Sequence, residues 1–317
     1  VLAFATIGVL TSTFLVGIIM HFMFGFFGYE INLIYCLLFG ALISPTDPIA
    51  VLGILKKVGA PKKLEAKIVG ESLFNDGVGV VIFLTIFSIA KQPNVSIEFT
   101  EILELFAVEV IGGLVLGIIL GYVTYKLLKS IDNYEVEVLI TIAAVMGGSL
   151  LAHKLHMSAP LAMVTAGLII GHDTVRNSAM SNVTEAYVDK FWELLDVLLN
   201  AVLFIMIGME MLVLSFELNY VIAGLIAVPI VLICRYTSLW LPIKFYSKRL
   251  QFVPNTNVIM TWGGLRGGIS IALALSLTTE MHRELFLVIT YIIVVISIIG
   301  QGLTVEPIMK RLTKEKH

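Results

Sequence analysis

Long apolar runs follow one another along almost the whole chain, and charged residues, prolines and glycines separate them. Most runs have about 20 residues or more, the length of helix that crosses a hydrocarbon layer of about 30 Å. The pattern predicts an all-α polytopic membrane protein with about ten transmembrane helices, forming a single transmembrane domain over residues 1–317. The predicted helices cover residues 2–24, 31–56, 66–90, 101–129, 134–153, 157–171, 187–209, 218–245, 254–279 and 283–310.

Composition agrees with a membrane protein and argues against several other classes. Of the 317 residues, 58% are apolar and 14% are charged, against about 25% charged in ordinary soluble domains. The net charge of −2 and the lack of a basic, aromatic-rich patch give no sign of nucleic-acid binding. Cys36 and Cys234 lack the spacing of metal ligands. Neither a GxSxG nor an HExxH motif occurs, so we expect neither an enzyme nor a cofactor.

Basic residues are distributed unequally between the two sets of loops. Ten spans place sixteen of the 21 basic residues on one side and three on the other, with Arg235 and Arg266 inside apolar runs. The side rich in lysine and arginine faces the cytoplasm in membrane proteins, so we expect both chain ends there. Arg235 lies late in its run, and we expect its side chain to extend to the basic side; a second buried cation is the alternative.

The sequence ISPTDP interrupts the second apolar run near its middle. Pro45 and Pro48 have no N–H to donate, and their rings clash with preceding carbonyls, so a regular helix cannot continue through them. Within lipid the freed carbonyls need protein, water or an ion as partners. Broken helices at mid-membrane are typical of transport sites. Thr46 supplies oxygens for a hard cation, and Asp47 a charge for a half-helix end.

The third predicted helix carries the polar residues Glu71, Ser72, Asn75 and Asp76 in an otherwise apolar run. At 100° per residue they fall within an arc of about 140°. Intramembrane acids mark ion or proton pathways, and a buried carboxyl can hold a proton or a cation but not both comfortably. Arg266, among four glycines in WGGLRGGIS, is a counter-charge for one acid. The helical angles leave open which acid it pairs with.

Together SPTDP, GESLFNDGVGVV and GGLRG resemble, in this order, the monovalent cation/proton antiporter-1 family, the sodium/proton exchangers. The resemblance covers essentially the whole chain. It implies the sodium/proton antiporter fold, with inverted repeats and two discontinuous helices that cross at mid-membrane. Members with thirteen helices have breaks in the fifth and twelfth, so the chain corresponds to such a protein without its first three helices. The resemblance also implies a homodimer in the plasma membrane.

Carried over by position, the resemblance implies that Asp76 binds the ion or the proton. Ser72 and Thr46 then supply oxygen ligands to Na⁺, Asn75 supports them, and Glu71 and Arg266 form a structural ion pair. Asn75, where other members have aspartate, implies electroneutral exchange of one cation for one proton.

The predicted function is secondary active exchange of Na⁺ (or Li⁺) for H⁺ by alternating access. A K⁺/H⁺ antiporter is the alternative, because the same ligands hold K⁺ in a slightly larger cavity. A proton or cation channel would need a continuous polar path, whereas the ionisable residues gather at one depth. The partners expected are therefore a monovalent cation, a proton and the lipid bilayer.

Overall fold

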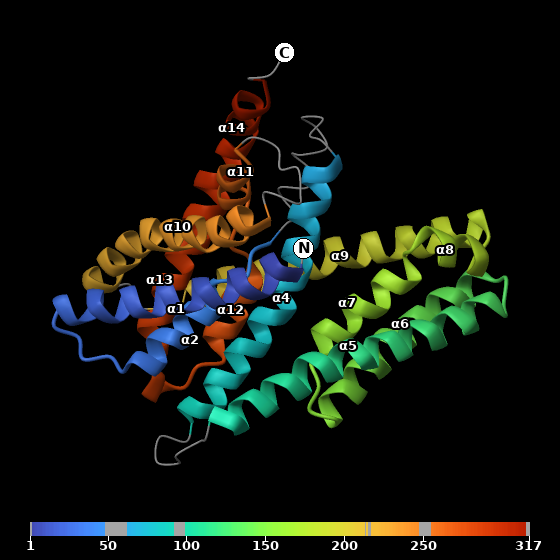
Figure 1. Ribbon diagram of the computed structural model, residues 1–317, viewed down its shortest axis with the longest axis horizontal. Helices are drawn as coiled ribbons and strands as arrows, with labels where there is room; N and C mark the ends of the chain where they lie inside the picture. Colours follow the sequence, from blue (N-terminus) through green and yellow to red (C-terminus); the bar gives the residue numbers. More distant parts are fainter. Residues whose placement is uncertain are drawn as a thin grey trace. The chain divides into compact units, whose positions relative to one another are not determined.

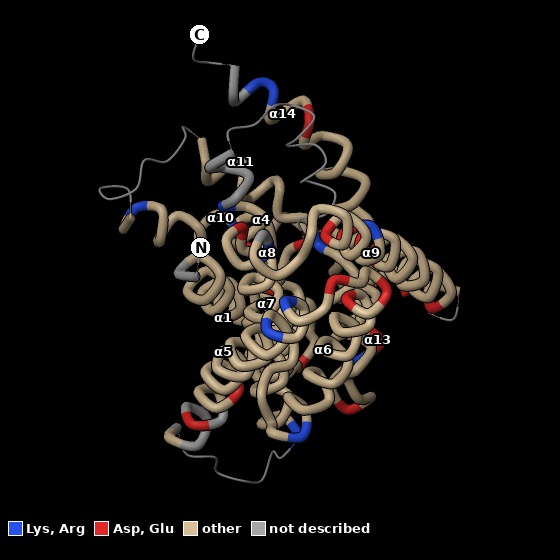
Figure 2. Tube along the Cα trace, turned by 90° about the vertical axis from the view of Figure 1, so that its right-hand side faces the viewer, with Lys and Arg blue, Asp and Glu red and all other residues tan. Residues whose placement is uncertain are grey.

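A computed structural model describes residues 2–47, 62–91, 99–212, 214, 217–246 and 255–314, which form helices joined by short connections. Among these residues, seven helices are long and apolar enough to cross a membrane, and two more, Leu33–Ile43 and Ala159–Ile170, are shorter and apolar. Figure 2 shows most of the trace in tan, with acidic and basic residues in short stretches. The prediction of a polytopic all-α membrane protein is confirmed.

The chain divides into two compact units, the first made of residues 1–95 and 210–317 and the second of residues 96–209. Whether they act as the single transporter domain predicted from the sequence stays a prediction. The helices of unit 1 are α1 (Leu2–Phe26), α2 (Leu33–Ile43), α4 (Lys62–Ala90), α10 (Leu218–Tyr246), α11 (Thr256–Trp262), α12 (Gly268–Leu275), α13 (Arg283–Ile296) and α14 (Gly302–Lys314). Within this unit α1 packs on α2, α4 and α10, and α10 packs on α13 (Figure 1).

Unit 2 is built from α5 (Phe99–Lys129), α6 (Tyr134–Lys154), α7 (Ala159–Ile170), the short α8 (Asp173–Ala179) and most of α9 (Asn182–Met211). Helices α5, α6 and α7 pack on one another (Figure 1). A glycine row on α5 explains how closely α7 approaches. A Cβ atom on Gly113 would lie 2.8 Å from the Ser158 carbonyl oxygen, and one on Gly117 only 2.5 Å from that of Ala162. Small residues at such interfaces let helix backbones approach within membranes.

Side-chain caps define where several helices begin. The Asn32 side chain accepts a hydrogen bond from the Ile34 amide, and the Asn133 side chain accepts from the Glu135 and Val136 amides. Ser158 caps α7 by accepting from the Leu161 amide. Each cap satisfies a backbone donor that the first helical turn leaves without a partner.

The ten predicted runs all contain helix, and three of them are not regular throughout. The second run forms α2 and leaves the helix at Ser44, and residues 48–56 of that run, with Pro48, lie outside the described residues. The ninth run is broken between α11 and α12, as the family resemblance implies. The tenth contains a π-helical turn, Ser297–Gln301, between α13 and α14. Helix α8 was not predicted, because its seven residues are mostly polar.

Candidate functional site

The first break follows α2 at residues 44–47 and packs against α4. Pro45 ends the helix and lies directly on Gly79 of α4. A Cβ atom on Gly79 would lie 2.3 Å from the Pro45 Cγ, so only glycine accommodates the proline ring here. The close approach brings the backbone of Thr46 to the polar face of α4.

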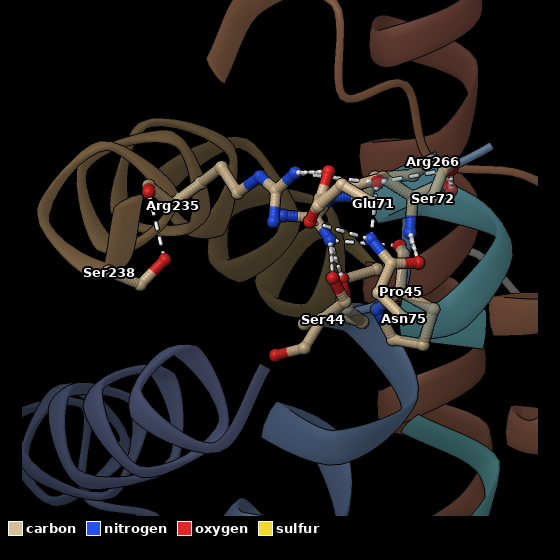
Figure 3. A network of polar contacts seen from close by, with 10 residues as sticks. Ser44, Pro45, Glu71, Ser72, Asn75, Arg235, Ser238 and Arg266 are labelled. Carbon is tan, nitrogen blue, oxygen red and sulfur yellow. Dashed lines mark hydrogen bonds and ion pairs between the residues drawn. The ribbon is translucent and has the colours of Figure 1, made fainter. Parts of the chain in front are cut away.

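Two polar side chains of α4, Ser72 and Asn75, which Figure 3 shows close together, hold Thr46. Its amide donates to the Asn75 Oδ1 at 3.2 Å, and the Asn75 Nδ2 donates to the Thr46 Oγ1 at 2.8 Å. The Ser72 hydroxyl donates to the Thr46 carbonyl. All three side chains are buried. The structure therefore brings together Thr46, Ser72 and Asn75, and their role as ion ligands stays a prediction.

Glu71 pairs with Arg235, not with Arg266. The Arg235 Nη2 lies 2.6 Å from the Glu71 Oε2, and both side chains are almost fully buried. The Asn75 Nδ2 also donates to the other Glu71 oxygen at 2.9 Å. The predicted Glu71–Arg266 pair is thus wrong. The expectation that Arg235 extends to the membrane surface is also wrong, since its side chain is 1% exposed and a buried charge needs a partner.

Arg266 instead caps the broken end of α2. Its Nη1 donates to the carbonyls of Ile43, Ser44 and Pro45, the last two at 2.5 and 2.9 Å. The final carbonyls of a helix have no partners within it and carry partial negative charge. A guanidinium is therefore a well-matched cap, and proline prevents the chain from supplying backbone donors there.

The two breaks also join through their backbones. The Asp47 amide donates to the Leu265 carbonyl at 2.8 Å, forming an isolated antiparallel bridge. The Asp47 side chain lies against Gly267, where an added Cβ atom would be 2.7 Å from the Asp47 Oδ2. The glycines around Arg266 therefore allow one break to approach the other.

Asp76 lies next to Asn75 on α4 and is half-buried. Within the described residues, its carboxylate makes no hydrogen bond or ion pair. The carboxylates that act on it electrostatically are Asp47 and Glu71. Among the described residues, Arg235 bonds to Glu71 and the Arg266 guanidinium bonds to backbone carbonyls, so neither arginine bonds to the Asp76 carboxylate. Carboxylate, hydroxyl and carbonyl oxygens are the ligands that hard cations prefer.

Sequence reasoning missed several polar residues that contact the breaks. The Ser44 hydroxyl donates to Ser12 on α1 at 3.0 Å and to the Gly40 carbonyl at 2.7 Å. Ser297 accepts from the Arg266 amide at 3.0 Å. Serine is common in transmembrane helices, so its presence alone is a weak signal. For Arg235 a signal existed, because an arginine within an apolar run is expected to have an acidic partner.

Comparisons with known proteins show which proteins the chain is similar to. The chain is 51% identical over 315 residues to the Na(+)/H(+) antiporter NhaP of Pseudomonas aeruginosa, covering 97% of this chain and 73% of that protein. It is 33% identical over 317 residues to the Na(+)/H(+) antiporter NhaH of Halobacillus dabanensis, covering 98% and 76%.

Among solved structures, the fold is similar to that of the sodium proton antiporter MjNhaP1 from Methanocaldococcus jannaschii. The TM-score is 0.80 at 18% identity, over 99% of this chain and 79% of that one. This likeness confirms the predicted fold class. The sequence also matches the family described as "Sodium/hydrogen exchanger, transmembrane" over residues 1–311. The chain belongs to the sodium/hydrogen exchanger family.

Proposed function

We propose that this protein exchanges Na⁺ for H⁺ across a membrane by alternating access, with Asp76 as the group that binds each in turn. The observation that carries the proposal is the state of Asp76. It is half-buried on a membrane-spanning helix, without a hydrogen bond or ion pair in the part of the chain that the structure describes. Glu71, the neighbouring acid of α4, is neutralised by Arg235, so Asp76 is the α4 carboxylate at the first break that we assign to the transported ion.

The neighbouring oxygens are the proposed ligands of Na⁺. Thr46 offers a hydroxyl and a carbonyl, and Ser72 offers a hydroxyl 3.5 Å from that of Thr46. Asn75 positions Thr46 through two hydrogen bonds, and Asp47 adds negative charge. When Asp76 takes up a proton its charge is lost and Na⁺ leaves, which couples the two flows.

Exchange of one Na⁺ for one H⁺ carries no net charge, and we propose this stoichiometry because Asn75 is uncharged. The excess of basic residues in one set of loops supports cytoplasmic chain ends in a plasma membrane. We also propose that the protein forms a homodimer and that it is a transporter and not an enzyme. Its support is the membership of the sodium/hydrogen exchanger family and the relatives named Na(+)/H(+) antiporters.

The test uses proteoliposomes with an acidic interior, in which internal pH is followed after NaCl, KCl or choline chloride is added outside. We expect alkalinisation with NaCl, none with choline, and the same rate when a membrane potential is imposed. Asp76→Asn removes the response, whereas Asp173→Asn, the same change at an exposed carboxylate on α8, leaves it intact. An equal response to KCl would make the protein a K⁺/H⁺ antiporter. A pH gradient that decays without added cation would contradict exchange.

A further inference from the structure

The second break leaves two backbone groups without their helical partners. Helix α11 ends at Trp262 and α12 begins at Gly268. In a continuous helix the Arg266 amide would donate to the Trp262 carbonyl, four residues earlier. Arg266 is 2% exposed and Trp262 is partly buried, and a backbone group without a partner is costly in such surroundings.

Two side chains from the π-helical turn between α13 and α14 bridge these groups. The Arg266 amide donates to the Ser297 Oγ at 3.0 Å, and this hydroxyl donates to the Gln301 Oε1 at 2.6 Å. The Gln301 Nε2 then donates to the Trp262 carbonyl at 3.2 Å. The missing helical hydrogen bond is thus replaced by three bonds in series, which we call the Ser–Gln relay.

The two residues of the relay are buried and lie in a distorted part of the helix. Ser297 is 2% exposed and Gln301 6% exposed. The two residues are the ends of the π-helical turn, a distortion that often occurs at functional sites. Thr304 on α14 accepts from the Trp262 indole Nε1 at 2.9 Å, so the last residue of α11 is held through its carbonyl and its ring.

We propose that Ser297 and Gln301 are positioning residues for ion exchange: they keep the second break open and so determine where the Arg266 side chain meets the first break. This rests on the proposed function. The relay holds the Arg266 amide, and the Arg266 guanidinium holds the carbonyls of residues 43–45, directly before Thr46. Without the relay, the Arg266 amide bonds to the Trp262 carbonyl and the helix closes. Arg266 then moves away from α2, and the oxygens of Thr46 lose their position.

The experiment measures Na⁺ half-saturation of exchange by the full chain in proteoliposomes. Ser297→Ala and Gln301→Met, the second nearly volume-conserving, are each expected to raise the half-saturating Na⁺ concentration about tenfold. Because both break the same relay, the double variant loses no more than the worse single variant. Ser297→Thr, which keeps the hydroxyl, restores most of the wild-type value.

Thr290→Val is the matched control, because it removes a buried hydroxyl of α13. Among the described residues this hydroxyl bonds only within its own helix, to the Phe286 carbonyl at 2.6 Å. This variant is expected to leave Na⁺ half-saturation unchanged. Unchanged half-saturation in the relay variants, or additive effects in the double variant, would overturn the relay. If Gln301→Met does not fold, Ser297→Ala and its rescue by Ser297→Thr decide the question.

The proposed function and the relay fail in different ways. A wild-type protein without Na⁺-driven exchange overturns the function. If the wild-type protein exchanges ions and the relay variants behave like Thr290→Val, only the relay is overturned. The unfolding temperature of each variant, measured in detergent, separates a positioning effect from a loss of the fold.

Discussion

The two breaks of unit 1 and the α5–α7 pair of unit 2 show two ways of stabilising helices in an apolar molecule. Around the breaks, backbone groups that have lost their helical partners are satisfied by side chains from other helices, including Arg266, Asn75, Ser297 and Gln301. Between α5 and α7 the backbones themselves touch, across Gly113, Gly117 and Gly121.

The difference concerns how easily each region can change. A side-chain hydrogen bond can be exchanged for another of similar energy, because the donor and acceptor keep their strength in a new arrangement. If two helices that touch at glycine positions slide past each other, their backbones no longer pack as densely. Close-packed interiors do not deform continuously. The region of the breaks is therefore suited to a conformational cycle, and the α5–α7 pair is suited to staying rigid.

The largest effect is expected at the buried ion pair. Arg235→Met leaves the Glu71 carboxylate buried without its cation, which costs about 3–5 kcal/mol of stability. Adding Glu71→Gln recovers much of this loss, because the unpaired charge is gone. Thermal unfolding in detergent measures both.

Arg266→Met with Glu71→Gln is the comparison variant for that pair. It is expected to be no more stable than Arg266→Met alone, since Arg266 binds carbonyls and not Glu71. The Glu71–Arg235 pairing would be contradicted if Glu71→Gln restored stability to Arg266→Met but not to Arg235→Met.

An intermediate loss of stability is expected at the interface of α5 and α7. In Gly117→Val the new Cβ atom meets the Ala162 carbonyl oxygen at 2.5 Å and the Thr165 Cβ at 2.6 Å. The helices must separate, at a cost of about 1–3 kcal/mol. Gly147→Val on α6 is the matched control, because no atom lies within 4 Å of its added Cβ. Unfolding temperatures that fall equally would show that close packing at α5–α7 is unimportant.

The smallest effect is expected at an exposed ion pair of unit 2. Arg176 pairs with Glu185 at 2.7 Å and with Asp189, and both acids are partly exposed. Arg176→Gln should therefore cost less than about 1 kcal/mol, and the loss should disappear in concentrated salt. Unfolding temperatures at low and high salt test this. A loss as large as that of Arg235→Met would show that exposure is not what separates the two pairs.

Much of the candidate site could be predicted because its signals are local. Pro45 forbids a regular helix wherever it lies, and the spacing of Ser72 and Asn75 places them on one side of any helix. The structure accordingly brings Thr46, Ser72 and Asn75 together. The choice of partner for Glu71 was not local, since helical angles do not say which of two arginines on other helices approaches it.

The sequence by itself determined the membrane-spanning class, the ten runs and the first interruption, because hydrophobicity and proline act over a few neighbouring residues. The second interruption was expected only from the family resemblance. Only the tertiary structure decided that Arg235 neutralises Glu71, that Arg266 caps α2, and that Ser297 and Gln301 bridge the second break. These contacts join residues far apart in the chain. The partner of a buried charge or backbone group depends on which helices meet, because low dielectric makes any nearby donor or acceptor of suitable geometry strongly favourable.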